Sequence, residues 1–384
     1  MINEKLLTQE VQQYINANLK SDLHSFLLKK SPFKEVSVQE LAQQIKGRQI
    51  AEKKFPFLLE KNIIFPPHLN LEQASSQATA EYKSNLISGK SFIDLTSGLG
   101  IDAFFLSKKF EEVSLVEQNA ELLEIVQHNW KVLNRNASFI NDNLENFLIQ
   151  NNKKFDVVYL DPARRDQQKN KVFLLEDLSP NILEIHHQLL SITDKVIIKL
   201  SPLIDLKYLI SELPSIYRID IVALKNEVKE VLIFLSHSQQ NQKVEIRGVN
   251  LETQEEDFVG SFNEESQSQA KFSDPQAFLY IPNNSILKSG FFNLLCTKFN
   301  LQKLHPNTHL YTSDVFMNEF PGRVLAVASI DSKSIKKGEQ YNIICKNFPL
   351  KPEEVKKKYK LKDGGNQYLI FTQSISGKII LKSI

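Results

Sequence analysis

The sequence predicts an α/β protein built on a parallel sheet, with helices before the sheet and small α+β domains after it. From Ser91 onward, apolar strand candidates alternate with helical stretches, an order typical of a parallel sheet with helices on both faces. Two later apolar runs, Arg218–Leu224 and Val228–Leu235, are separated by only three residues. That gap permits a hairpin but no helical crossover, so the last strand is expected to be antiparallel. Residues up to about 75 carry apolar side chains at helical spacing.

The N-terminal and central elements follow from this periodicity. Helices are expected at Leu7–Leu28, from Ser37 through Ile50 and at Leu71–Leu86, and Ser37 with Glu40 forms a capping-box pattern. Between the strands, helices are expected at Ala120–Leu133 and Pro180–Leu190. The strands expected before the final pair are Phe92–Leu95, Glu112–Val116, Ala137–Ile140, Val157–Leu160 and Lys195–Lys199.

The C-terminal part predicts one or two small α+β modules. The segment from His237 to Pro275 is rich in Gln, Ser and Glu and is interpreted as a domain boundary carrying a hairpin. The predicted domains are a helical region at 1–75, the parallel-sheet domain at 76–237, a linker with a small domain at 238–322 and a terminal domain at 323–384. The expected elements are strands at Val244–Val249, Phe278–Ile281, Arg323–Ile330, Tyr341–Cys345, Tyr368–Thr372 and Lys378–Leu381, and helices at Asn284–Phe299 and Lys351–Lys360.

Composition excludes several classes of protein. The chain has 384 residues, of which 42% are hydrophobic and 24% charged, as in ordinary globular proteins. No apolar run reaches the length of about 20 residues that spans a bilayer. Two cysteines, Cys296 and Cys345, cannot form a disulfide framework or a Cys-based zinc site. We therefore expect a cytoplasmic protein without a metal, and a net charge of +2 implies no global attraction to nucleic acid.

The segment 91–100 is the first candidate site. It is typical of an apolar strand that enters a tight turn containing Gly98 and Gly100, followed by a helix. Glycine lets the backbone approach a ligand, and a helix N-terminus offers free N–H groups. Thr96 stands where a dinucleotide-binding pattern has its first glycine, so the turn suits a smaller group than a pyrophosphate. The alternative is a tight turn in some other α/β enzyme.

Acidic residues follow the next two strands. Glu117 lies about 20 positions after the glycine turn, where a carboxylate can accept hydrogen bonds from both ribose hydroxyls. The alternative is a solvated residue at a strand end, while Asn119 is a candidate cap of the following helix. Asp142 and Asn143 come after the third strand and can accept from an adenine amine, although both residue types also favour ordinary turns.

The fourth strand ends in Asp161-Pro162, followed by Arg164 and Arg165. Pro162 restricts Asp161 to extended geometry and places its carboxylate at the sheet edge where open α/β sheets bind ligands. The arginines can bind phosphate or stack on a base; alternatively they pair with the acids Asp166, Glu176 or Asp177. After the fifth strand, Lys199 or Ser201 either borders the substrate pocket or ends the strand in a turn.

Taken in order, these motifs resemble those of class I S-adenosylmethionine-dependent methyltransferases over residues 70–237. The chain further resembles bacterial methyltransferases with a C-terminal THUMP-like domain, in segments 77–83, 161–165 and 362–365. This resemblance implies a Rossmann-like seven-stranded sheet, a ferredoxin-like domain and a THUMP-like domain. It also implies that S-adenosylmethionine is bound with its methionyl part at the glycine turn, where Asp94 positions the amino group. The implied site residues are Asp161, Pro162, Arg164 and Arg165 for the acceptor, and Asp94, Thr96, Ser97, Gly98, Gly100, Asp102, Glu117, Asp142 and Asn143 for the cofactor.

The resemblance implies RNA as the substrate, either tRNA or rRNA, because THUMP domains are associated with RNA binding. Ten lysines and five acids lie between Asp331 and Asp363, and lysines favour phosphate contacts; the alternative is a solvated helix face. Arg164 occupies the place of the aromatic residue that stacks a flipped base in many amine-methylating enzymes, so exocyclic amine methylation is not indicated. Neither cysteine lies near a predicted strand end of the sheet, which favours direct transfer without a covalent intermediate. The rival hypotheses are a small-molecule or protein acceptor and a non-catalytic RNA-binding protein.

Overall fold

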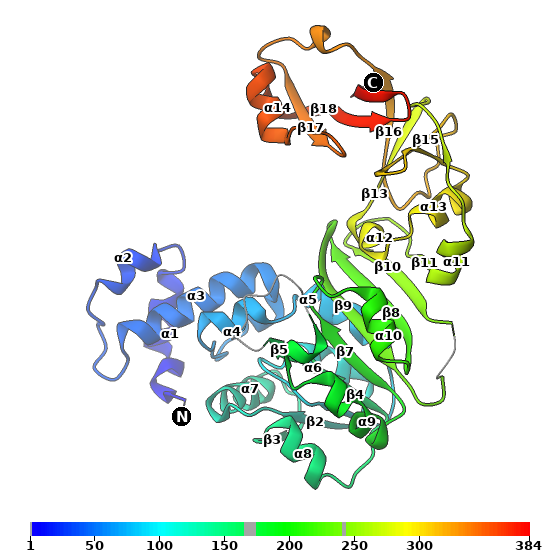
Figure 1. Cartoon of the computed structure of the whole chain (residues 1–384). Helices are drawn as coiled ribbons and strands as arrows, with labels where there is room; N and C mark the ends of the chain where they lie inside the picture. Colours follow the sequence, from blue (N-terminus) through cyan, green and yellow to red (C-terminus); the bar gives the residue numbers. More distant parts are fainter. Residues whose placement is uncertain (1, 165–173, 240–242) are drawn as a thin grey trace. The chain divides into compact units, whose positions relative to one another are not determined.

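The computed structural model describes residues 2–164, 174–239 and 243–384. The chain forms two compact units (Figure 1). The first contains Met1–Tyr217 with Leu232–Asn241, and the second contains Arg218–Val231 with Gln242–Ile384. The domain boundaries predicted at residues 75, 237 and 322 stay a prediction.

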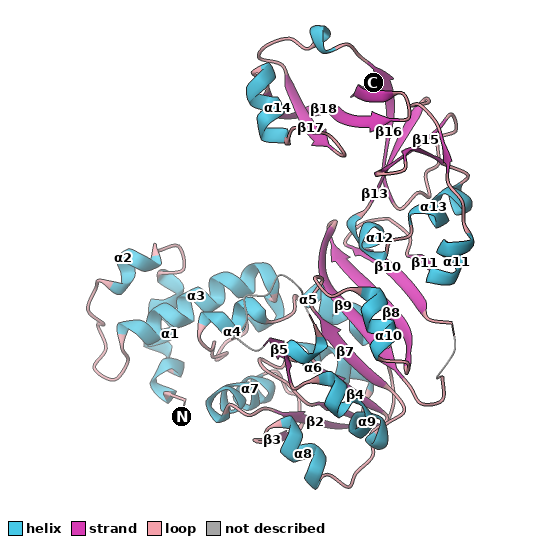
Figure 2. Cartoon of the chain, viewed as in Figure 1, coloured by secondary structure: helices cyan, strands magenta, loops and turns pink. Residues whose placement is uncertain are grey.

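The N-terminal region is helical, as predicted (Figure 2). The capping box at Ser37 is present: its hydroxyl accepts from Glu40 N–H, and the Glu40 carboxylate accepts from Ser37 N–H at 2.7 Å. The single helix predicted at Leu7–Leu28 was wrong, because the chain turns after Ala17 and Asp22 caps a second, short helix. The elements are η1 (Glu4–Leu7), α1 (Gln9–Ala17), α2 (Leu23–Leu27), α3 (Val38–Lys54), η2 (Pro56–Leu58) and α4 (His68–Gln73).

The helix predicted at Leu71–Leu86 is also two helices, α4 and α5 (Gln77–Ser84). Ala74 has extended geometry, and the hydroxyl of Ser76 caps α5 by accepting from Thr79 N–H at 3.3 Å. The break leaves Ser75 buried between the helices. Helix α3 and the following segment pack on the sheet domain through a shared core that contains Phe55, Phe65 and Phe105.

The large sheet has the predicted parallel core. Strands β1 to β4 and β7 run parallel and pair in the order β7-β4-β1-β2-β3. The strands are β1 (Ser91–Asp94), β2 (Glu112–Val116), β3 (Ser138–Ile140), β4 (Val157–Leu160) and β7 (Val196–Leu200). The connecting helices are α6 (Ile101–Leu106), η3 (Ser107–Lys109), α7 (Ala120–Val132), α8 (Leu144–Gln150), η4 (Leu175–Asp177), α9 (Ile182–Ile192) and α10 (Leu206–Glu212).

The last two predicted strands form the expected hairpin, β8 (Ile216–Leu224) and β9 (Glu227–Leu235). Its two-residue turn, Lys225-Asn226, has positive φ at both positions, the geometry of a type I′ turn between antiparallel strands. Two further strands, β10 (Glu245–Leu251) and β11 (Phe258–Gly260), extend the seven predicted strands to nine. The full order is β11-β10-β8-β9-β7-β4-β1-β2-β3.

The second unit contains an eight-stranded sheet with the order β12-β14-β15-β13-β16-β19-β18-β17. The helix predicted at Asn284–Phe299 was wrong as a single element, because Gly290 adopts a left-handed conformation between α12 and α13. Strands β14 and β15 have no counterpart in the prediction. The elements are α11 (Phe262–Gln267), β12 (Lys271–Phe272), β13 (Phe278–Pro282), α12 (Asn284–Ser289), α13 (Phe292–Phe299), β14 (Gln302–His305), β15 (Thr308–Ser313), β16 (Gly322–Ser329), η5 (Ser332–Ser334), β17 (Gln340–Cys345), α14 (Pro352–Tyr359), β18 (Lys362–Ser374) and β19 (Gly377–Ser383).

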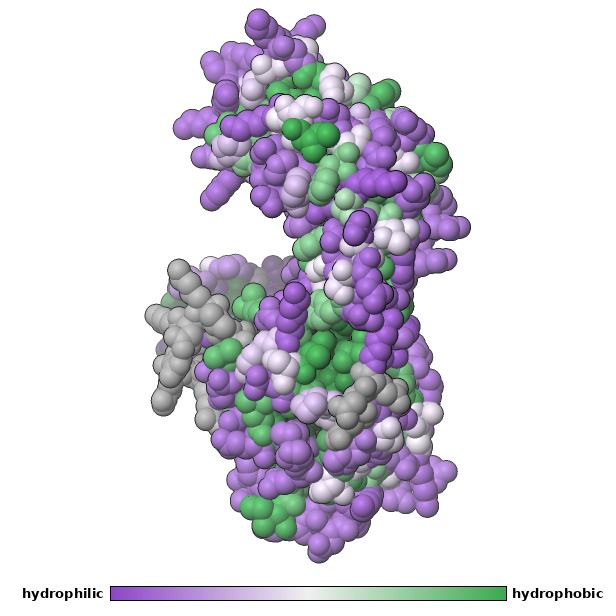
Figure 3. All heavy atoms as spheres, turned by 45° about the vertical axis from the view of Figure 1, so that its right-hand side comes forward, coloured by the Kyte–Doolittle hydropathy of each residue, from purple (hydrophilic) through white to green (hydrophobic). Residues whose placement is uncertain are grey.

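Hydrophilic residues cover most of the face that Figure 3 shows for the C-terminal residues, at the top of the view. Among the helices of the described residues, none has both the length and the apolar character needed for crossing a bilayer.

Candidate active site

The glycine turn and the end of β4 are joined by Thr96. Its backbone N–H donates to Asp94 Oδ1 at 3.0 Å, and its hydroxyl oxygen accepts from the backbone N–H of Asp161 at 2.6 Å. Strands β1 and β4 are neighbours, with Asp94 opposite Tyr159. The predicted cofactor turn and the predicted acceptor residue therefore lie together at the carboxyl edge of the sheet, where ligands of open α/β sheets bind.

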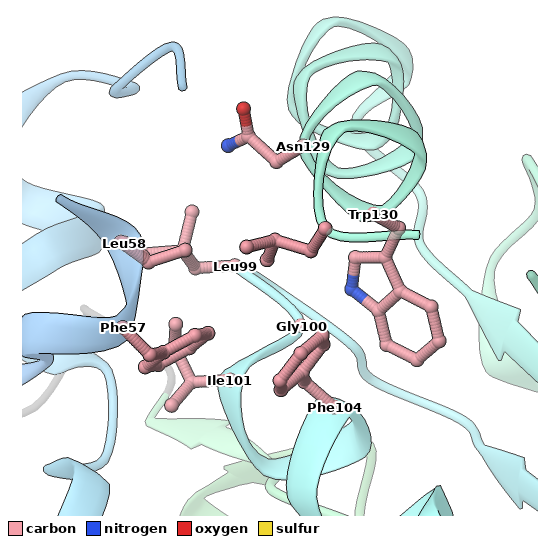
Figure 4. Close-up of a pocket in the computed structure, with 9 residues that line it drawn as sticks. Phe57, Leu58, Leu99, Gly100, Ile101, Phe104, Asn129 and Trp130 are labelled. Carbon is pink, nitrogen blue, oxygen red and sulfur yellow. The ribbon is translucent and has the colours of Figure 1, made fainter. Parts of the chain in front are cut away.

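The two glycines of the turn have different surroundings. Both have positive φ, +51° at Gly98 and +70° at Gly100. A Cβ on Gly100 would lie 2.9 Å from Val126 Cγ1 and 3.1 Å from Trp130 Nε1, whereas a Cβ on Gly98 would meet nothing closer than 3.9 Å. Figure 4 shows Gly100 beside the rings of Trp130 and Phe104 in a small pocket that is lined by apolar side chains and Asn129. Gly100 is therefore needed for packing, and Gly98 leaves open space above the turn.

Glu117 lies at the end of β2, and its carboxylate reaches the turn. Oε2 accepts from the backbone N–H of Gly98 at 2.9 Å, and Oε1 accepts from Asn119 N–H at 2.8 Å. Asn119 caps α7, as predicted, by accepting from Leu122 N–H at 3.1 Å. Two backbone N–H groups therefore hold the Glu117 carboxylate beside the turn. Each carboxylate oxygen accepts one of these bonds and keeps a lone pair for a ligand.

Asp142 and Asn143 follow β3 and make turn contacts. The Asp142 carboxylate accepts from Asn143 N–H at 2.8 Å, and the Asn143 side chain caps α8 by accepting from Asn146 N–H at 2.8 Å. Both side chains are half-buried. The cap uses one lone pair of the Asn143 amide oxygen, and contact of either residue with an adenine ring stays a prediction.

The residues after β4 are described only in part. Pro162 is buried, and Arg164 is exposed in the two-residue strand β5 (Ala163–Arg164), opposite Leu178 in β6 (Leu178–Ser179). Arg165 and Asp166 lie outside the described residues. Glu176, one of the acids considered as an arginine partner, accepts from the Tyr208 hydroxyl at 2.7 Å.

Asp102 is the centre of a buried polar network. Its carboxylate lies 3.0 Å from Lys83 Nζ and 3.5 Å from Lys199 Nζ. It also accepts from the hydroxyls of Ser75 and Tyr159, both at 2.7 Å. These contacts direct the Asp102 carboxylate toward protein groups, and its predicted contact with the cofactor stays untested.

Lys199 connects this network to Asp161. Its Nζ lies 2.5 Å from Asp161 Oδ2 and donates to Ser75 Oγ at 3.0 Å. Lys199 and Ser201, which the sequence offered as alternatives at the site, thus differ in their contacts, because only Lys199 contacts Asp161. Ser201 accepts from Leu203 N–H at 3.3 Å, a turn contact.

Burial and charge shift the pKa values of the three carboxyls in different directions. Burial raises the pKa of Asp94 well above its usual range, although the hydrogen bond from Thr96 opposes the shift. For Asp102, burial is the largest effect and raises the pKa, but Lys83, Lys199 and the hydrogen bonds from Ser75 and Tyr159 together more than offset it, so the pKa is lowered. Burial also raises the pKa of Asp161, against the attraction of Lys199.

Sequence reasoning missed Ser75, Lys83 and Tyr159 as members of the site. Lys83 was noted only as part of segment 77–83, and its side chain is 1% exposed. A lysine on the buried face of a helix is a signal, because lysine is almost never fully buried unless it is paired. Tyr159 was interpreted as an apolar strand residue, and nothing near Ser75 indicated the break between α4 and α5.

Metal and thiol chemistry have no evident site among the residues that the structure describes. The described residues contain no group of three or more His, Cys, Asp and Glu side chains arranged to hold a metal ion. Cys296 lies in α13 and Cys345 in β17, and neither element belongs to the large sheet. Burial raises the pKa of the two thiols, to about 12 for Cys296 and about 11 for Cys345.

Family models match three parts of the chain. A model described as conserved hypothetical protein 95 matches residues 73–187, which include the glycine turn and the end of β4. A ferredoxin-like domain matches residues 278–321, and a THUMP domain-like model matches residues 323–381.

Two known proteins are similar to this chain. A crystal structure of a candidate methyltransferase from Porphyromonas gingivalis W83 is 28% identical, with a TM-score of 0.87 over 100% of this chain and 98% of that one. An uncharacterised RNA methyltransferase from Mycoplasma mobile is 34% identical over 90 residues, which are 23% of this chain. The match spans about a quarter (24%) of that curated relative's length.

The sheet with its antiparallel end, the matched domains and the similar Porphyromonas gingivalis structure support a class I methyltransferase. More narrowly, the chain is similar to a methyltransferase and carries C-terminal ferredoxin-like and THUMP-like domains, which confirms the resemblance drawn from the sequence. S-adenosylmethionine is the methyl donor of this class.

Proposed function

We propose that this chain transfers a methyl group from S-adenosylmethionine to RNA, without a covalent bond between enzyme and RNA. The observation that carries the proposal is the hydrogen bond from the backbone N–H of Asp161 to the hydroxyl oxygen of Thr96, at 2.6 Å. It holds the turn proposed for the donor next to the residue proposed to face the acceptor. Alignment of donor and acceptor is the main requirement of a direct transfer.

The residues of the turn fit S-adenosylmethionine. Gly98 leaves its outer side open, and the buried hydroxyl of Ser97 has no hydrogen-bond partner among the described residues, so it is free to bond a ligand. Asp94 and Thr96 would hold the methionyl end, Glu117 the ribose, and Asp142 the adenine. The bound cofactor supplies an electrophilic methyl group, and this chain's residues orient it and exclude water.

Direct transfer fits the state of the two cysteines. Covalent methylation of a pyrimidine carbon needs a thiolate nucleophile. Burial keeps the pKa of both thiols well above neutral, and neither lies near the turn in sequence or on a strand of the large sheet. Asp161 to Arg165 are therefore proposed to contact the acceptor nucleotide without forming a bond to it.

RNA as the substrate is supported by the C-terminal domain and by one relative's name. Residues 323–381 match a THUMP domain-like model, and the Mycoplasma mobile relative is named as an RNA methyltransferase. Of the ten lysines between Asp331 and Asp363, nine are exposed, and among the described residues only Lys356 forms an ion pair with an acid. Exposed lysines without acidic partners suit phosphate binding. We also propose a cytoplasmic location, where tRNA or rRNA is available.

The proposal is tested by mass spectrometry of RNA nucleosides from cells with and without this protein, with tRNA and rRNA purified separately. A methylated nucleoside that disappears in the deletion, and returns with the wild-type gene but not with Asp161→Ala, is the expected result. An unchanged nucleoside profile would overturn RNA as the substrate. In that case, transfer of labelled methyl from S-adenosylmethionine to small molecules or protein from the same cells distinguishes another acceptor from a non-catalytic chain.

A further inference from the structure

One ammonium group is shared between two carboxylates at the proposed site. Lys199, near the end of β7, has its Nζ 2.5 Å from Asp161 and 3.5 Å from Asp102, and its side chain is 11% exposed. The proposed function so far uses neither Lys199 nor the buried charges behind it. The arrangement requires an explanation, because burying several charges costs free energy unless their geometry is well matched.

The charge of Asp102 is already balanced without Lys199. Lys83 Nζ lies 3.0 Å away, and the hydroxyls of Ser75 and Tyr159 both donate to Asp102 Oδ2. Ser75 Oγ in turn accepts from Lys83 at 3.2 Å and from Lys199 at 3.0 Å. The four charges therefore alternate in the order Asp161, Lys199, Asp102, Lys83, and they sum to zero. Lys83 with Asp102 forms the fixed inner pair, and the ammonium of Lys199 is directed to Asp161.

Asp161 is the only member of this chain of charges with a substantial exposed side chain, at 36%, against 1% for Lys83, 9% for Asp102 and 11% for Lys199. Lys199 contacts its Oδ2, so Oδ1 is left for a group outside the network. The buried members hold the Asp161 carboxylate in place, while about a third of its side chain stays accessible.

We infer that Lys199 is a positioning residue that keeps the Asp161 carboxylate ionised and fixed in one orientation, so that it takes the proton of the methyl acceptor. The inference rests on the proposed methyl transfer. The acceptor nitrogen or oxygen bonds to the methyl carbon and loses its proton to Asp161, while the electron pair of the C–S bond stays on sulfur. The acceptor is therefore a group with an N–H or O–H proton, as a ring imino or hydroxyl group of a nucleotide has.

The charges around Asp161 explain why a cation is needed there. Burial raises the pKa of Asp161, and Asp102 on α6 and Asp94 on β1 act in the same direction. Lys199 on β7 is the largest opposing influence, and Lys83 on α5 adds a smaller one. Without Lys199, the carboxyl would become neutral at a higher pH and could no longer accept a proton there.

The inference is tested first without cofactor or RNA. The full chain is labelled with carboxyl-¹³C aspartate, and the Asp161 signal is assigned by its loss in Asp161→Asn. We expect Lys199→Met to raise the titration midpoint of Asp161 by about 1–3 pH units, since an opposite charge at this distance lowers a carboxyl pKa by that amount. Lys199→Arg, which keeps the charge, is expected to restore most of the shift. Lys195→Met is the matched control, because Lys195 is exposed and directly precedes the same strand.

A midpoint in Lys199→Met equal to that of the wild type, in protein with a native spectrum, would overturn the inference. If Lys199→Met does not fold, Lys199→Gln gives the same test, because it removes the charge and keeps a hydrogen-bond donor. The second readout is the pH profile of methyl transfer to total RNA from cells that lack the protein. Its acid limb is expected to move to higher pH in Lys199→Met, with an unchanged KM for S-adenosylmethionine. No transfer to RNA by the wild type would contradict the proposed substrate, whereas the titration result would still decide the role of Lys199.

Discussion

The carboxylate of Glu117 accepts a hydrogen bond from the backbone N–H of Gly98 at 2.9 Å, which joins the end of β2 to the glycine turn. The second oxygen accepts from Asn119 N–H, at the start of α7. Two backbone groups on different elements thus fix the carboxylate before any ligand arrives. A ligand at the turn meets an acceptor that loses little side-chain entropy on binding.

Replacing Glu117 by Ala is expected to weaken S-adenosylmethionine binding by about 10–100-fold, because hydrogen bonds to a charged group contribute about 1.5–3 kcal/mol. Isothermal titration of the full chain measures the affinity. Glu112→Ala is the control on the same strand, since Glu112 is exposed and makes only a surface ion pair with Lys90 at 3.7 Å. Equal affinities for wild type and Glu117→Ala would contradict the ribose-binding role of this acid.

Alanine at the two glycines of the turn is expected to separate folding from binding. Gly100→Ala places a Cβ 2.9 Å from Val126 Cγ1, and such overpacking costs about 1–3 kcal/mol in addition to the strain of positive φ. Gly98→Ala meets open space and should cost only the left-handed strain of about 1–2 kcal/mol, but its methyl group occupies the room of the ligand.

Thermal melts and S-adenosylmethionine titrations of both glycine variants provide the measurement. Gly100→Ala is expected to lower the melting temperature more than Gly98→Ala does. Gly98→Ala is expected to lose more affinity than its melting temperature accounts for. The reverse order of the two effects would mean that the open side of the turn does not face the ligand.

The strands of the sheet could be predicted because their signal is local. Glu112–Val116 and Val157–Leu160 have the predicted bounds, since a short apolar run between polar segments leaves few alternatives. The break at Ala74–Ser76 could not be predicted, because Ala-Ser-Ser contains no helix breaker. It is stabilised by contacts of Ser75 with Asp102 and Lys199, which are distant in sequence.

The same distinction applies to the site. The turn, Glu117 and Asp161 lie at strand ends, and topology alone brings strand ends together. The buried partners of Asp161 do not follow from strand order. Lys83 reaches Asp102 across 19 positions and Lys199 reaches it across 97, so these pairs depend on how α5 and α6 pack. A single sequence contains no signal for such a pairing beyond an unusually buried lysine.

The ionisation of Asp94 is expected to make S-adenosylmethionine binding depend on pH. Burial raises its pKa well above the usual range, so in the free protein the carboxyl stays neutral up to a higher pH than an ordinary aspartate does. S-adenosylmethionine is positively charged at its amino group and favours the ionised form of Asp94. The affinity for S-adenosylmethionine should therefore rise with pH until Asp94 is ionised. Titration calorimetry over a pH series below the pKa of the donor's amino group measures this, and Asp94→Asn should bind weakly with little pH dependence.

The same shift fixes the sign for stability. The pKa of Asp94 is higher in the folded state than in the unfolded state, so the folded chain binds more protons. Asp94 therefore destabilises the fold as the pH rises from its unfolded pKa to its folded pKa. Asp94→Asn is thus expected to raise the melting temperature by a few degrees near neutral pH and by less below the unfolded pKa. A stabilisation that grew toward acid would contradict the raised pKa.

Lys83→Met is expected to destabilise the first unit by about 3–5 kcal/mol, because it leaves the buried Asp102 carboxylate without its nearest cation. Urea unfolding followed by Trp130 fluorescence reports on this unit, since Trp130 is the single tryptophan and is buried in α7. Lys90→Met is the control, because Lys90 forms an exposed pair with Glu112 that is worth about 1 kcal/mol or less. Similar losses for both variants would show that Asp102 does not depend on Lys83.

The exposed lysines Lys336, Lys337, Lys360 and Lys362 lie on two adjoining segments of the C-terminal domain and together are termed the basic cluster. Backbone bonds from Gly338 N–H to Lys360 O and from Lys362 N–H to Glu339 O hold the two segments together. Glu339 is the nearby acid, and its carboxylate accepts from the backbone N–H of Lys336 at 2.8 Å. Four cations fixed on two adjoining segments suit the closely spaced phosphates of an RNA strand.

Replacing these four lysines by Gln is expected to weaken binding to bulk tRNA and to make it less sensitive to salt. Each phosphate contact that is lost should reduce the slope of log affinity against log salt by about 0.7–0.9. Affinities measured over a salt series in the full chain give that slope. The control replaces four exposed lysines of the helical region, Lys20, Lys30, Lys34 and Lys53. If the salt slope falls by the same amount in both quadruple variants, tRNA is attracted by the total charge of the protein, and the basic cluster is no specific RNA site.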